Sequence, residues 1–300
     1  MDMTQNKCCR HGASLRRRRC RRRKILRSII FSCSIIAVAV FVAVGSSMIR
    51  SGDGRTNKYD VEAGNNIYDN AVIKNSKISE KNKIQNNQSM LDDIMNSTQY
   101  PKQLKDLALK NEEALEFVYD YPAEHVKEHT IDLTEEASMD SVPLFVQWDK
   151  RWGYEKYSGN FFAASGCGPT TLSMVVVYLT HNREASPIAV AKYSKEAGYS
   201  VDGSGSSWTL ISEGCRHYGV KAKTVALDES RMKAELDEGH PIVVNVGPGD
   251  FTDTGHFMVI TGYDDEGFSI NDPNSIEKSG KRWLFRNISS QIRAVWSMYV

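Results

Sequence analysis

The chain has 300 residues and a formal net charge of +1, a length that fits one or two domains. The charges are unevenly distributed along the chain. Residues 1–50 carry twelve Lys or Arg and one acidic residue, whereas residues 51–300 carry 26 Lys or Arg and 36 acidic residues. Of six cysteines, only Cys167 and Cys215 follow residue 50, which excludes a disulfide-rich scaffold.

The N-terminal region has the charge pattern of a membrane anchor. Residues 1–27 form a basic tail that contains the run Arg16–Lys24, and residues 28–49 carry no charge. A helix of that length spans about 33 Å, enough to cross a bilayer core of about 30 Å. Because basic flanks stay in the cytoplasm, we expect a cytoplasmic N-terminus, one transmembrane helix at 28–49 and an extracellular remainder.

Two alternatives exist for this region. A secretory signal peptide would be cleaved near the small residues Gly45 and Ser46. The basic run alone is also typical of nucleic-acid binding. Its position directly before the apolar segment favours a topology signal instead, so nucleic acid is not an expected partner.

Residues 50–99 are polar with isolated apolar residues, which predicts a flexible linker. From Pro101 onward, apolar residues recur at close to helical spacing and predict a helix of about 18 residues that ends before Pro122. We call residues 100–139 the spacer. One helix cannot bury its apolar face alone, so the spacer should dock on the following domain; a solvated helix is the alternative.

Residues 140–300 are long enough to form their own core. Predicted helices cover 167–179, 187–197, 207–218 and 229–238, with Ser186 as an N-cap and Gly219 closing the third helix. Predicted strands cover 142–146, 220–226, 241–246, 256–263, 268–270 and 293–300. Helices followed by strands predict the α+β class, with helices packed on an antiparallel sheet.

Cys167 is the strongest candidate for a chemical role. It lies between Gly166 and Gly168 and opens a predicted helix. The helix dipole and free backbone N–H groups favour a thiolate there and can bind a developing oxyanion. Glycine also permits close approach of a ligand to the backbone. We predict that Cys167 is a nucleophile and Cys215 a buried thiol; a disulfide between them would silence the nucleophile.

Three further residues complete the predicted site. His256 opens a strand that would hold its imidazole rigidly as the base. Asp272 follows a strand and would orient that imidazole. Asn271 is the alternative, but strand alternation sends the two side chains to opposite faces, and we choose Asp272. Gln147 is a weaker candidate, whose amide could join the Cys167 N–H in an oxyanion hole.

Four segments, at 142–152, 165–170, 255–263 and 270–274, resemble in their order the C39-like cysteine peptidases, which are bacterial papain-like domains. The resemblance covers about residues 140–300 and implies a papain-like fold with a Cys helix on an antiparallel sheet. It also implies the roles of nucleophile for Cys167, base for His256, orienting acid for Asp272 and oxyanion donor for Gln147. Exporter-linked members cut leaders after a double glycine; this chain has no phosphate-binding Gly-Lys-Ser/Thr motif, so that substrate is not carried over.

The sequence therefore predicts an outward-facing, membrane-anchored cysteine peptidase that acts on a peptide or protein, including cell-wall peptide. It needs no cofactor, and no Cys and His cluster with zinc spacing predicts a metal. One alternative is a cell-wall peptide amidase, endopeptidase or acyl transferase with the same triad. The other is a catalytically silent peptide-binding module.

Overall fold

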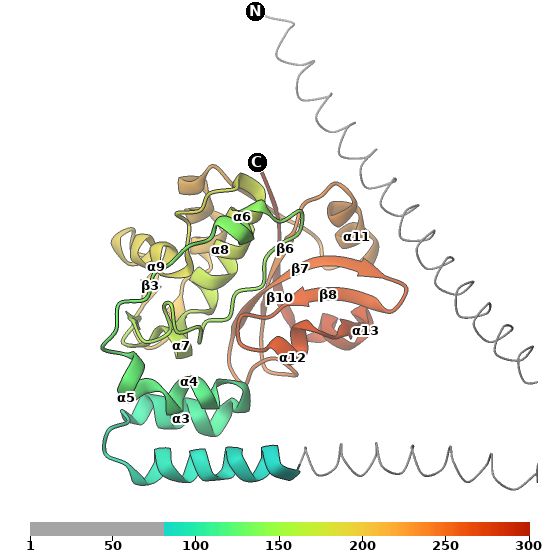
Figure 1. Ribbon diagram of the computed structural model, residues 1–300. Coiled ribbons are helices and arrows are strands. Elements are labelled where there is room, and N and C mark those ends of the chain that lie inside the picture. The colour runs from blue at the N-terminus through green and yellow to red at the C-terminus, as the bar shows by residue number, and fades with distance from the viewer. Residues whose placement is uncertain (1–80) are drawn as a thin grey trace, which may run out of the picture. The chain divides into compact units, whose positions relative to one another are not determined.

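The computed structural model describes residues 81–300 (Figure 1). The predicted basic tail, the transmembrane helix at 28–49 and the linker up to residue 80 lie outside these residues. Within residues 81–300, no helix combines the length and apolarity needed to cross a bilayer.

The region before the main domain differs from the prediction in two ways. Residues 81–96 form a helix rather than flexible linker, because Ile94 is fully buried against the spacer, with Met90 and Leu91 packed beside it. The spacer is not one long helix, since Asn111 adopts an extended backbone and its side-chain oxygen accepts the Glu113 N–H, which starts a new helical turn. The elements of the spacer are α3 (Lys102–Lys110), η1 (Glu112–Ala114), α4 (Leu115–Tyr119), α5 (Tyr121–Glu124) and α6 (Thr134–Ser138).

The spacer docks on the main domain, as predicted. Leu104, Leu115 and Val118 bury their side chains in a cluster that also contains Phe161 and Ala163 of the main domain. Figure 1 shows α3, α4 and α5 lying together beside α7 (Phe162–Ser165) and α12 (Ile276–Ser279). The spacer therefore contacts the chain immediately before Cys167.

The main domain is built on a six-stranded antiparallel sheet with the order β5-β10-β6-β7-β8-β9. These strands are β5 (Lys221–Thr224), β6 (Ile242–Val246), β7 (His256–Asp264), β8 (Gly267–Asn271), β9 (Arg282–Trp283) and β10 (Ile292–Tyr299). β10 follows the other five in sequence but lies between β5 and β6. The mixed fold with an antiparallel sheet confirms the predicted α+β class.

Helices cover both faces of this sheet, so β6 is buried along its whole length. One face packs on a core that includes Leu172, Val176 and Phe257; the other packs on Met232 and Ile288. The first face carries α8 (Cys167–Thr180), α9 (Pro187–Glu196), α10 (Thr209–Ser212) and η2 (Gly214–Tyr218); the second carries α11 (Glu229–Asp237), α13 (Phe285–Ile288) and η3 (Ser289–Gln291). Two small hairpins are β1 (Lys156–Tyr157) with β2 (Asn160–Phe161), and β3 (Ser200–Val201) with β4 (Gly205–Ser206).

Local sequence signals account for several boundaries. The Ser186 hydroxyl accepts the Ala189 N–H and caps α9, and Gly219 ends η2 in the left-handed conformation, which confirms both predictions. The strand predicted at 142–146 is wrong: this segment pairs with no strand. Pro143 has no N–H to donate to a ladder. Instead, the Asn271 side chain donates to the carbonyls of Val142 and Pro143.

Candidate active site

Cys167 is the first residue of α8, which packs across β7. At a helix N-terminus the first backbone N–H groups have no partner within the helix and point outward. The Thr171 hydroxyl, one turn along, donates to the Phe257 carbonyl at 3.1 Å and ties α8 to the start of β7. Cys167 is partly exposed as a residue, although its thiol lies in a buried environment.

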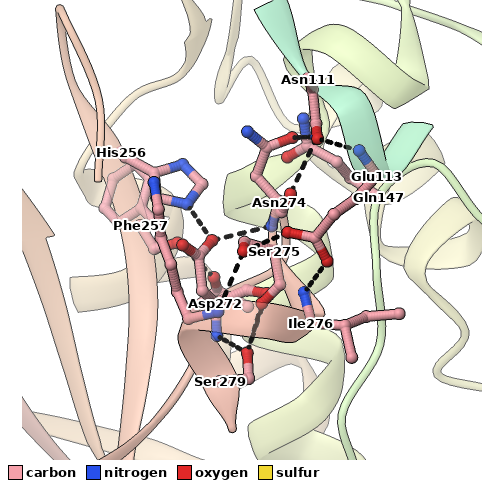
Figure 2. Close-up of polar contacts among 12 residues, drawn as sticks. Asn111, Glu113, Gln147, His256, Phe257, Asp272, Asn274, Ser275, Ile276 and Ser279 are labelled. Carbon is pink, nitrogen blue, oxygen red and sulfur yellow. Dashed lines mark hydrogen bonds and ion pairs between the residues drawn. The ribbon is translucent and has the colours of Figure 1, made fainter. Parts of the chain in front are cut away.

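His256 and Asp272 form a buried ion pair beside this thiol. His256 Nε2 lies 2.7 Å from Asp272 Oδ1 (Figure 2), and the two side chains are only 7% and 1% exposed. His256 opens β7, and Asp272 directly follows β8, the neighbouring strand. Because Nε2 is bonded to the carboxylate, Nδ1 is the ring nitrogen available to the Cys167 thiol.

The environment favours a thiolate and an imidazolium. Burial opposes the charged thiolate, but the hydrogen bond and charge of His256 outweigh it, with help from the N–H groups of Phe257 and Gly168, so the pKa of Cys167 lies below its ordinary value. Burial also opposes the imidazolium. The charge of Asp272, its hydrogen bond and the Cys167 thiol outweigh that effect and raise the pKa of His256 to about 10.

Asn271, the alternative to Asp272, points elsewhere. Its amide donates to the carbonyls of Val142 and Pro143, at 3.2 and 3.0 Å. The structure thus brings Cys167, His256 and Asp272 together and uses Asn271 to hold the segment that leads to Gln147.

Gln147 is buried and bridges two parts of the site. Its backbone N–H donates at 2.7 Å to the carbonyl of Pro273, the residue directly after Asp272. Its side-chain Nε2 donates to the Ala163 carbonyl, also at 2.7 Å, four residues before Cys167. An amide nitrogen carries two hydrogens, so one remains for a ligand.

The glycines beside Cys167 have a different role from the one the sequence suggests. A Cβ on Gly166 would lie 2.6 Å from the Phe162 ring, and a Cβ on Gly168 would lie 2.6 Å from the Ser206 hydroxyl. The space over each glycine is therefore filled by the protein's own side chains rather than kept for a ligand. Gly168 allows the β3–β4 hairpin to pack on the N-terminus of α8.

Sequence reasoning missed the backbone support of Asp272. The Asn274 N–H donates to Asp272 Oδ1 at 2.8 Å, the oxygen that also binds His256. The Asp272 N–H donates to the Ser279 hydroxyl at 2.9 Å. An Asp side chain that accepts the N–H two residues on is a common turn, and Asp272-Pro273-Asn274 carried that signal.

Cys215 is fully buried in the core beside α8, and burial raises its pKa to about 11. Both Cys167 and Cys215 are free thiols. Within the described part of the chain, no group of three or more His, Cys, Asp or Glu is arranged to hold a metal ion.

Comparison with known proteins places this arrangement in a family. Residues 139–300, more than half of the chain, match the Peptidase_C39 like family. The protein belongs to this family. Membership in the Peptidase_C39 like family confirms the resemblance read from the sequence motifs, and the match contains all four predicted site residues.

Two solved structures are similar to this family member. One is the peptidase domain of Streptococcus ComA, described as a bifunctional ABC transporter involved in a quorum-sensing pathway: 20% identity, 45% of this chain and 90% of that chain covered, TM-score 0.37. The other is a putative C39-like peptidase from Bacillus anthracis: 16% identity, 53% and 95% covered, TM-score 0.33. Comparison with curated proteins finds no match.

Proposed function

We propose that this protein is a cysteine peptidase that cleaves peptide bonds with a Cys167–His256–Asp272 triad. The observation that carries the proposal is the buried His256 Nε2–Asp272 Oδ1 contact of 2.7 Å beside a thiol of lowered pKa. A thiolate is the reactive form of cysteine, and an oriented imidazolium beside it is the proton donor that the next step needs.

Acylation begins with attack of the Cys167 thiolate on the carbonyl carbon of the substrate. The carbonyl oxygen becomes an oxyanion, which the Cys167 N–H and the second Gln147 amide hydrogen stabilise. The intermediate collapses when the C–N bond breaks and the His256 imidazolium gives its proton to the leaving amine. The product of this half-reaction is a thioester on Cys167 and a free amine.

Deacylation reverses the proton flow. The now neutral imidazole of His256 takes a proton from water, which attacks the thioester carbonyl. The C–S bond breaks, the acid product leaves and the thiolate–imidazolium pair returns. Throughout, Asp272 keeps Nε2 bonded and Nδ1 directed at the reacting atoms. Apart from the attacking water, this chemistry uses only groups of the chain.

We also propose that the peptidase domain faces outward from the membrane. Support comes from the uncharged segment 28–49 and from the basic run that precedes it. A membrane-impermeant thiol reagent applied to intact cells tests this topology. Labelling of Cys167 without labelling of Cys8, Cys9 or Cys20 is the expected result; labelling only after lysis would overturn it.

The catalytic proposal is tested by alkylation of each cysteine as a function of pH, read by peptide mapping of the full-length protein. Fast alkylation of Cys167 well below the ordinary thiol pKa of about 8.5, lost in His256→Ala, is the expected result. Ordinary, slow alkylation in both proteins would overturn the catalytic proposal and leave the catalytically silent peptide-binding module as the remaining hypothesis. Digestion of a mixed peptide library and of cell-wall peptides then separates a peptidase from the amidase and acyl-transferase alternatives.

A further inference from the structure

The spacer reaches the site through one short turn. In η1 and the residue before it, Asn111 and Glu113 direct their side chains at the segment between β8 and α12, here called the Asp272 loop (residues 272–275), as Figure 2 shows. These contacts join residues more than 160 positions apart in sequence. Neither residue belongs to the matched family region, which begins at residue 139.

Glu113 holds the far end of the Asp272 loop. Its carboxylate accepts the Ser275 hydroxyl in a short hydrogen bond and the backbone N–H groups of Ile276 and Glu277, at 2.7 and 3.1 Å. These are the first N–H groups of α12, which have no partner within the helix. One side chain from the spacer therefore caps the helix that follows the loop.

Asn111 holds the middle of the loop. Its amide donates to the carbonyl and to the side-chain oxygen of Asn274, at 2.9 and 3.0 Å. Trp148 Nε1 donates to the same carbonyl at 3.2 Å. The backbone of Asn274 is thus fixed from two sides.

Asn274 and Ser275, the two residues held by these anchors, each contact Asp272, whose carboxylate binds His256. The Asn274 N–H donates to Asp272 Oδ1, and Ser275 pairs with Asp272 in an isolated β-bridge. Ser279 of α12 closes the ring by accepting the Asp272 N–H. A shift of Asn274 or Ser275 would therefore turn the Asp272 carboxylate.

We propose that Asn111 and Glu113 are positioning residues for the peptidase, and that docking of the spacer sets the orientation of Asp272 toward His256. This inference rests on the proposed function. It assigns to a segment outside the family region an effect on the reacting pair that acts through the Asp272 loop.

Loss of the Asn111 and Glu113 contacts should change the pKa of Cys167 in one direction. If Asp272 turns away, the imidazolium of His256 loses its largest source of stabilisation, and the thiolate of Cys167 loses its cationic partner. The pKa of Cys167 then rises toward its ordinary value. Below that pKa, each unit of increase lowers the thiolate population about tenfold.

The test is Glu113→Ala in the full-length protein, with Glu112→Ala as the matched control. Both glutamates lie in η1, but the Glu112 side chain accepts from Asn87 at 2.7 Å, outside the peptidase domain. Site-resolved alkylation of Cys167 against pH should shift to higher pH in Glu113→Ala, with a rate at neutral pH about tenfold lower. The Glu112→Ala control should have the same alkylation profile as the wild-type protein.

A double-mutant cycle separates positioning from general loosening. Asp272→Asn should lower Cys167 reactivity, and adding Glu113→Ala to it should change nothing more, because the two act through one contact. Additive losses would overturn the inference, as would an unchanged profile in Glu113→Ala. If Glu113→Ala does not fold, Glu113→Gln decides, since it keeps one acceptor and should shift the profile the same way by less.

The outcomes also separate this inference from the proposed function. An ordinary Cys167 in the unchanged protein defeats the peptidase proposal. If Cys167 is reactive and its alkylation profile is unchanged in Glu113→Ala, only the positioning role is overturned.

Discussion

The side-chain amide of Gln147 donates to the carbonyl of Ala163, whose own side chain packs against the spacer. The amide that is proposed to meet the oxyanion is thereby held by the turn that leads into the Cys167 helix. A donor fixed in this way needs no reorganisation when charge develops on the substrate.

We predict that Gln147→Glu lowers kcat by about 10²-fold, the usual effect of losing one oxyanion donor. The substitution keeps the shape of the side chain and removes both amide hydrogens. Alkylation of Cys167 forms no oxyanion, so its rate should fall much less than kcat, by no more than the repulsion between the new carboxylate and the thiolate accounts for. Steady-state kinetics on a cleaved peptide and alkylation of the same sample check both halves. Equal losses in the two assays would show that Gln147 supports the fold around Cys167 instead.

The pH profile of peptidase activity should have an acid limb set by Cys167 and an alkaline limb set by His256. Activity should rise as pH passes the lowered pKa of Cys167 and fall as pH passes about 10, where His256 loses its proton. In Asp272→Asn the alkaline limb should move down toward the ordinary histidine value of about 6.5, because the charge of Asp272 is what chiefly opposes the effect of burial. A profile of kcat/KM against pH for both proteins measures this. An alkaline limb that stays in place would contradict the assignment.

The free energy of unfolding should also depend on pH through the His256–Asp272 pair. The pKa of His256 is higher in the folded protein than in the unfolded chain, so folding binds protons and the pair stabilises the native state most at low pH. The contribution is full below about pH 6.5 and is lost as pH rises through about 10. Chemical denaturation at several pH values should show a smaller alkaline loss of unfolding free energy in Asp272→Asn than in the unchanged protein. Parallel pH dependences would contradict this expectation.

We predict that Gly168→Ala destabilises the fold by about 1 to 3 kcal/mol, the usual range for overpacking. The new Cβ would meet the Ser206 hydroxyl at 2.6 Å and its Cβ at 2.7 Å, so the β3–β4 hairpin must move off α8. Ser206→Gly in the same chain should restore most of the loss. Gly262→Ala is the control, since a Cβ there meets nothing within 4 Å. Denaturant unfolding measures all of these variants, and a neutral Gly168→Ala would contradict the packing argument.

Truncation should reveal that the stable folded unit begins before residue 139, the start of the matched family region. Residues 81–300 lie within one compact unit, so a protein with this range should react at Cys167 like the full chain. A protein that begins at residue 139 loses the apolar cover of Phe161 and Ala163 and the cap on α12. Its melting temperature should fall by about 5 °C or more, since 1 kcal/mol corresponds to about 2 to 4 °C at this size. Thermal scans of the two proteins provide the comparison, and equal melting temperatures would contradict it.

Local signals account for the parts of the fold that were predicted from sequence. Ser186 before Pro187 marked a helix start, Gly219 a helix end, and alternation along the chain separated Asn271 from Asp272. Each of these choices depends on a few neighbouring residues. The same reasoning failed at 142–146, where an apolar run looks like a strand but Pro143 and the Asn271 side chain replace the ladder.

The contacts of Glu113 lay beyond sequence reasoning for a physical reason. Glu113 is one of several glutamates on an amphipathic segment, and nothing nearby distinguishes it from the exposed Glu112. Its partners at Ser275 and Ile276 become neighbours only after the spacer docks, and docking is decided by the apolar cluster around Leu104 and Phe161. Long-range polar contacts of this kind follow from packing, so they are known only when the packing is known.

The place of β10 in the sheet affects when the fold can be completed during synthesis. The ribosome makes β10 after the other five strands, yet β10 must enter between β5 and β6. Until it does, β5 has no neighbour in the sheet and β6 lacks one of its two neighbours. The support for β7, and with it His256, is completed only at that point. A nascent chain therefore completes the sheet that holds the His256–Asp272 pair only after translation has passed β10.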